Sequence, residues 1–85
     1  MSTRPNTGAK YSRKTERAIE KYGFGNCVWA ARQCDHYGEG ASTIAEGMGW
    51  TTKDGRTNTQ AADAACDAGR EIIEEQRAFD LERGA

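Results

Sequence analysis

Residues 59–82, TQAADAACDAGREIIEEQRAFDLE, carry the strongest periodic pattern in the chain. Small and apolar side chains recur on one side at helical spacing, while acidic side chains occupy the opposite side. Thr57 and Gln60 have the spacing of a capping box, which marks the start of a helix. The pattern predicts one long helix over about 59–82, whose apolar side is formed by Ala62, Ala65, Cys66, Gly69, Ile72, Ile73, Gln76 and Phe79.

Gly69 stands in the middle of this predicted helix, on its apolar side. A glycine inside a helix destabilises it by up to ~1 kcal/mol relative to alanine, because glycine loses more backbone freedom. A residue without a side chain also lets a second helix approach closely, which would explain a glycine on the apolar side. We therefore expect tight helix packing at Gly69.

Three shorter helices are predicted before residue 59. Apolar side chains at helical spacing predict the first over about 12–22. The second is predicted over about 27–37 with Asn26 as its N-cap residue, and the third over about 44–48 from the capping-box spacing of Thr43 and Glu46. Asp54-Gly55 between threonines is typical of a tight turn and predicts a short β-hairpin.

The predicted fold class is mainly α, with three to four helices and the short β-hairpin near Asp54-Gly55. Residues 1–9 are small, polar and contain the only proline, which predicts a flexible N-terminal arm before a single small helical domain over 10–85. Only eight of the 85 residues are Leu, Val, Ile or Phe. This scarcity excludes a membrane span and a large enzyme core.

The cysteines and the N-terminus point to a reduced, cytoplasmic setting. No apolar run follows the first basic residue, so no secretory signal is predicted. The three cysteines, Cys27, Cys34 and Cys66, cannot all pair within one chain. Cys27 and Cys34 would lie about 10 Å apart along one helix, beyond the reach of a disulfide.

Charge is segregated along the chain although the net charge is only −1. Residues 1–21 hold six basic and two acidic side chains, whereas residues 22–85 hold six basic and eleven acidic ones. The acidic side of the long helix is either a solvated face or a ridge that docks on a basic surface of a partner. Candidate partner contacts are the acidic residues Asp63, Asp67, Glu71, Glu74 and Glu75, with Trp29 and Trp50 as candidate anchors.

A second hypothesis is a small DNA-binding transcriptional regulator. A basic stripe on the first predicted helix could contact phosphates, or could simply be solvated or paired with the acidic helix. The segment Thr43–Trp50 is similar to the first helix and turn of a helix-turn-helix, but Asp54-Gly55 would interrupt a recognition helix after it. The candidate nucleic-acid contacts are Lys10, Lys14, Arg17 and Lys21.

No combination of residues predicts an enzyme or a cofactor site. Cys34 and His36 are two residues apart, so on a helix they point about 200° apart and cannot form a nucleophile–base pair. A zinc site from Cys27, Cys34, His36 and Cys66 has suitable ligand types but lacks the usual short spacing between two cysteines. Small cysteines buried in a tight helical interface are the simpler interpretation, so no metal is predicted.

The segment Trp50-Thr-Thr-Lys-Asp-Gly-Arg, followed by an alanine-rich helix, resembles the hairpin-then-helix part of small phage-encoded accessory proteins. Size, segregated charge and the lack of catalytic residues resemble the anti-CRISPR type of inhibitor within that group. The resemblance implies a non-enzymatic inhibitor or adaptor in the cytoplasm of a bacterial host. Its partner would be a host protein or ribonucleoprotein complex, whose DNA-binding surface the acidic helix blocks.

Overall fold

The computed structural model describes residues 11–82, and for residues 79–82 it describes the backbone alone. Within that range the chain forms four helices: α1 (Arg13–Tyr22), α2 (Phe24–Asp35), α3 (Ala41–Met48) and α4 (Thr59–Glu82). The prediction of a mainly helical protein is confirmed, and so are the bounds of the long helix. The predicted arm over residues 1–9 and the side chain of Phe79 lie outside the described part. No helix in residues 11–82 is both long and apolar enough to cross a membrane.

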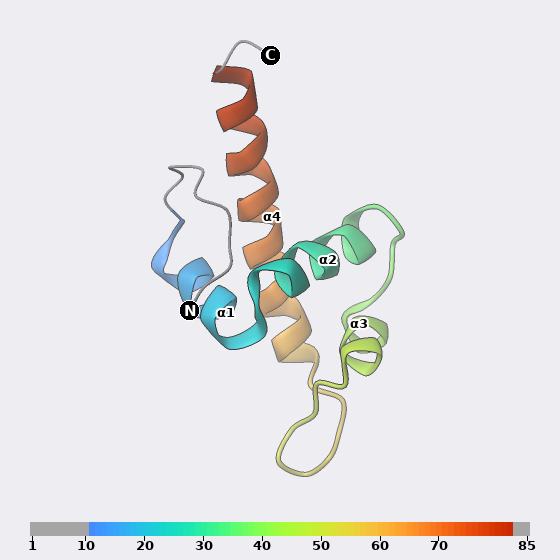
Figure 1. Ribbon diagram of the computed structural model, residues 1–85. Helices are drawn as coiled ribbons and strands as arrows, with labels where there is room; N and C mark the ends of the chain where they lie inside the picture. The colour runs from blue at the N-terminus through green and yellow to red at the C-terminus, as the bar shows by residue number, and fades with distance from the viewer. Residues whose placement is uncertain (1–10, 83–85) are drawn as a thin grey trace.

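Helix α4 is the axis of the fold, because it packs against each of the other three helices and most extensively against α2. Its C-terminal turns extend past the other helices, as Figure 1 shows. Asn58 caps its first turn, since the Asn58 Oδ1 accepts a hydrogen bond from the backbone N–H of Ala61 at 3.1 Å. The predicted capping residue, Thr57, is therefore one residue early, while the helix itself starts at Thr59 as predicted.

Helices α1 and α2 are separated by Gly23 alone, so α2 begins earlier than predicted. Gly23 has a φ angle of 99°, a conformation that favours glycine and that turns the chain sharply. Asn26 is not the N-cap residue: it lies inside α2, and its side-chain amide donates to the backbone carbonyl of Tyr22 at 2.8 Å. At the start of α1, the Ser12 hydroxyl accepts a bond from the backbone N–H of Thr15, which is the capping role typical of serine.

The predicted capping box of the third helix and the predicted β-hairpin are both wrong. Helix α3 already begins at Ala41, so Thr43 lies inside it. Between α3 and α4 the chain forms a loop closed by one isolated antiparallel bridge between Thr51 and Thr57. Two backbone hydrogen bonds form the bridge, from the Thr52 N–H to the Arg56 carbonyl at 2.8 Å and from the Asn58 N–H to the Trp50 carbonyl at 2.9 Å. Residues 11–82 accordingly contain no β-strand.

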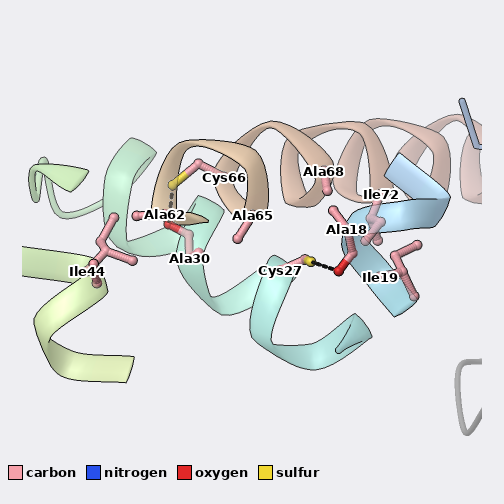
Figure 2. Packing of buried hydrophobic residues seen from close by; sticks show 11 residues of the cluster. Ala18, Ile19, Cys27, Ala30, Ile44, Ala62, Ala65, Cys66, Ala68 and Ile72 are labelled. Carbon is pink, nitrogen blue, oxygen red and sulfur yellow. Dashed lines mark hydrogen bonds between the residues drawn. The ribbon is translucent and has the colours of Figure 1, made fainter. Parts of the chain in front are cut away.

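The core consists mostly of small side chains from all four helices (Figure 2). Two buried thiols are hydrogen-bonded to backbone carbonyls: Cys27 Sγ to Ala18 O at 3.7 Å, and Cys66 Sγ to Ala30 O at 3.4 Å. Such contacts require close helix packing, because alanine and cysteine reach only a short distance from the backbone. The buried cluster contains Ala18, Ile19, Cys27, Ala30, Ile44, Ala45, Ala62, Ala65, Cys66, Ala68 and Ile72.

Gly69 lies at a close contact between α2 and α4. A Cβ atom added there would lie 2.0 Å from the Cys27 carbonyl oxygen and 2.7 Å from the Ala31 Cβ. Both distances are far below van der Waals contact, so no side chain fits at this position. The expectation of close helix packing at Gly69 is confirmed.

Candidate partner-binding surfaces

The acidic residues of α4 do not form one uniform surface. Asp63, Asp67 and Glu74 are exposed, whereas Glu71 and Glu75 are half-buried. Asp63 and Glu74 make no hydrogen bond or ion pair with the part of the chain that the structure describes. Arg70 and Arg77 are exposed within the same row and reduce its negative charge.

Glu71 holds the start of α1. Its carboxylate accepts hydrogen bonds from the Ser12 backbone N–H, from the Ser12 hydroxyl at 2.9 Å and from the Thr15 hydroxyl at 3.0 Å. Partial burial works to raise the pKa of Glu71, but these hydrogen bonds outweigh it, and the pKa lies below its ordinary value. Glu71 therefore has a structural role within the chain, which spacing along α4 could not indicate.

Arg70 connects the exposed acidic row of α4, formed by Asp63, Asp67 and Glu74, to the end of α2. Its guanidinium donates two hydrogen bonds to Asp35, from Nε to Oδ2 at 2.9 Å and from Nη2 to Oδ1 at 2.8 Å, and a third from Nη1 to Asp67 at 3.2 Å. The bond from Arg70 lowers the pKa of Asp35. The Arg70 and Asp35 side chains are 43% and 51% exposed, so solvent screens their attraction. The pair places Asp35 beside the acidic row of α4, and the two together are called the acidic face below. Sequence patterns on α4 alone could not identify Asp35, because it belongs to α2.

The basic side of α1 is exposed, but two of its residues contact other side chains of the chain. Lys14 lies 3.8 Å from Asp67, so one member of the predicted basic stripe faces the acidic helix. Lys21 lies over the Tyr22 ring at 5.5 Å, and Arg17 is exposed. Lys10 falls outside the described residues. The loop after α3 occupies the place where a helix-turn-helix would need its recognition helix.

Trp29 lies at the surface of α2, beside a shallow hollow of about 480 Å³. It is 38% exposed, and Tyr37 beside it is 66% exposed. The Gln33 side-chain amide lies between Trp29 and Glu39. In the orientation that bonds both, its oxygen accepts a hydrogen bond from Trp29 Nε1 at 3.2 Å and its nitrogen donates one to Glu39 Oε2 at 3.1 Å. The hollow is lined by Phe24, Gly25, Val28, Trp29, Arg32, Gln33 and Tyr37.

The indole of Trp29 is therefore held in place while part of it faces solvent. On the side toward α3, its Cη2 atom lies close to the backbone of Gly47, where an added Cβ would be 3.7 Å away. An aromatic ring that is already ordered loses little freedom on binding, which is the property of an interface anchor. The sequence singled out Trp29, but it did not indicate that Tyr37 and Arg32 share its surroundings.

Trp50, the other candidate anchor, has a different environment. It is half-buried and packs against the core, with its ring 4.9 Å from that of Tyr22 between centroids. This contact joins the loop after α3 to the end of α1. Trp50 therefore stabilises the fold, while Trp29 is the tryptophan available to a partner.

The residues considered for zinc are not brought together as a metal site. Within residues 11–82 no group of three or more His, Cys, Asp or Glu side chains could hold a metal ion. Burial raises the pKa of Cys27 to about 11, and that of Cys66 to about 11 with a further contribution from Cys34. His36 is exposed at the end of α2, with its ring against Tyr37 at 4.8 Å.

No protein-family model matches this chain, and comparison with curated proteins and with solved structures gives no significant match.

Proposed function

We propose that this protein is a non-enzymatic inhibitor or adaptor that binds a nucleic-acid-binding complex of a bacterial host. In this proposal the protein acts in the host cytoplasm, in the manner of the anti-CRISPR type of inhibitor. Its acidic face occupies a basic surface of the complex, and Trp29 anchors the contact. Complementary charge speeds docking and selects the partner, while an exposed aromatic side chain that the partner buries supplies binding energy.

The observation that supports this proposal is the set of carboxylates that stay exposed after the internal bonds of the chain are made. Asp63, Asp67 and Glu74 lie on one side of α4, and Asp35 joins them from α2 through Arg70. At 1.5 Å per residue, the three carboxylates of α4 span about 16 Å along the helix. A row of this length can contact a groove that is built to hold a nucleic-acid backbone.

Reversing the charge of the exposed row is expected to abolish partner binding. The variant carries Asp63→Lys, Asp67→Lys and Glu74→Lys, and leaves Glu71 unchanged because Glu71 holds α1. We expect at least tenfold less of the host complex to be retained in a pull-down from bacterial lysate, because attraction becomes repulsion. Circular dichroism checks that the variant is folded.

A matched control carries three reversals at exposed acidic residues elsewhere: Glu20→Lys, Glu46→Lys and Asp54→Lys. It changes the net charge by the same amount and is expected to retain the complex. Equal retention by both variants contradicts the proposal. Retention of nucleic acid alone, lost when Arg17 and Lys21 become Ala, would favour the DNA-binding regulator instead.

Replacing Trp29 with alanine is expected to weaken the same interaction by tenfold or more while the fold persists. The reason is that Trp29 is partly exposed and outside the buried cluster, so its loss removes contact area from a partner more than from the core. The measurement is the affinity for the partner recovered above, alongside a thermal unfolding curve. Tyr37→Ala tests the edge of the hollow, and unchanged affinity in Trp29→Ala would remove the hollow from the interface.

A further inference from the structure

Cys34 lies between two residues that are one turn apart on α4, Cys66 and Arg70. The Arg70 Nη2 donates a hydrogen bond to Cys34 Sγ at 3.2 Å. On the other side, Cys66 Sγ lies 3.4 Å from the carbonyl oxygen of Ala30. In α2 that carbonyl is one turn before Cys34 and accepts its backbone N–H. The Cys34 and Cys66 side chains meet across the contact between α2 and α4, close enough for a side-chain hydrogen bond.

Exposure separates the three thiols. Cys34 is half-buried and can be reached by a small reagent, whereas Cys66 is 4% exposed and Cys27 is fully buried. Cys27 is bonded to Ala18, about 10 Å along α2 from Cys34. An oxidant thus meets Cys34 first, and the thiol within reach of Cys34 is Cys66.

We infer that Cys34 and Cys66 form a redox modification site that reacts with hydroperoxides. The Cys34 sulfur attacks the O–O bond, takes one oxygen to become sulfenic acid, and releases the other oxygen as an alcohol or water. The Cys66 sulfur then attacks the Cys34 sulfur, forming the S–S bond and releasing water. In total the two thiols lose two electrons and two protons, and the hydroperoxide takes them up.

Arg70 is the positioning residue of this site. Asp35 fixes its guanidinium through two hydrogen bonds, and Nη2, which makes one of them, also donates to the Cys34 sulfur. A fixed cation next to a partly exposed thiol is one feature of cysteines that react with peroxide, and the Asp35 carboxylate also contacts Cys34. The disulfide would join the end of α2 to α4. It would close a loop in the unfolded chain and so reduce the conformational freedom of the unfolded state.

The test is treatment of the reduced full-length chain with hydrogen peroxide, followed by mass spectrometry. We expect a monomer lighter by about 2 Da, the mass of two hydrogens, with a cross-linked peptide that joins Cys34 to Cys66 and with Cys27 left free. The oxidised chain should unfold at a higher temperature. A cross-link to Cys27, a disulfide between two chains, or no loss of mass would overturn the inference.

Variants assign the order of the two steps. Cys66→Ala should stop at the sulfenic acid of Cys34, which dimedone traps, while Cys34→Ala should not react. Arg70→Gln should slow the formation of the disulfide several-fold, and it can be compared with Arg77→Gln, which changes an exposed arginine about two turns further along α4. Equal rates in the two arginine variants would remove Arg70 from the site, and dimedone labelling of Cys66 in Cys34→Ala would overturn the assigned order.

Discussion

Gly69→Ala is expected to lower the free energy of unfolding by about 2–3 kcal/mol, a cost typical of overpacking a core. The added methyl would overlap the carbonyl oxygen of Cys27 and the Cβ of Ala31, at 2.0 and 2.7 Å. Neither atom belongs to a flexible side chain, so the two helices must move apart. The gain in helix propensity, up to ~1 kcal/mol, is smaller than this loss.

Separation of α2 and α4 would affect much of the core. The thiol of Cys66 would lose its bond to Ala30, and the small side chains around it cannot extend to fill the gap. Chemical denaturation followed by circular dichroism measures the change. An unfolding free energy equal to or above that of the parent would contradict the close packing at Gly69.

Gly47→Ala is the matched control, because Gly47 also lies inside a helix. It is exposed on α3, and its added methyl would lie 3.7 Å from Trp29 Cη2, an ordinary van der Waals contact. Higher helix propensity is then the main effect, and we expect stabilisation of up to ~1 kcal/mol. The two substitutions are chemically identical. A decrease in the free energy of unfolding for Gly69→Ala and an increase for Gly47→Ala would therefore isolate the effect of packing.

Glu71→Gln is expected to destabilise the protein by about 1.5–3 kcal/mol at neutral pH, the range for hydrogen bonds to charged groups. The amide can still accept hydrogen bonds through its oxygen, but its nitrogen would face the donors of Ser12 and Thr15. Thr15 is 4% exposed, so water cannot replace the lost partner. Loss of these bonds frees the start of α1 from α4.

The contribution of Glu71 should also depend on pH. Its pKa in the folded chain lies below the ordinary value of 4.5, so folding favours the ionised carboxylate. The stabilisation is fully present above pH 4.5 and is lost as the pH falls through the folded pKa. The difference between the parent and Glu71→Gln should therefore shrink in acid. The exposed Glu74→Gln should change stability by less than about 0.5 kcal/mol at any of these pH values, and an equal effect of both variants would contradict the role of Glu71.

The local patterns of the sequence predicted the helices well, but of the contacts between helices they predicted only the close packing at Gly69. Periodicity located α4 because small and acidic residues recur on opposite sides of it over more than six turns. The position of Gly69 on the small-residue side also predicted close packing there. Short patterns were less reliable: Thr43 and Glu46 have capping-box spacing, yet α3 begins before them. A pattern of four residues fits several helix registers, whereas a pattern of twenty fits one.

The candidate site shows the same division. The sequence alone determined that Asp63, Asp67 and Glu74 lie on the exposed side of α4, because helical spacing sets this without reference to other parts of the chain. Tertiary structure alone decided that Glu71 holds α1, that Arg70 joins Asp35, and that Trp29 is exposed while Trp50 packs on Tyr22. These contacts join residues far apart in the chain. They depend on where and how closely the helices cross, which local spacing does not encode.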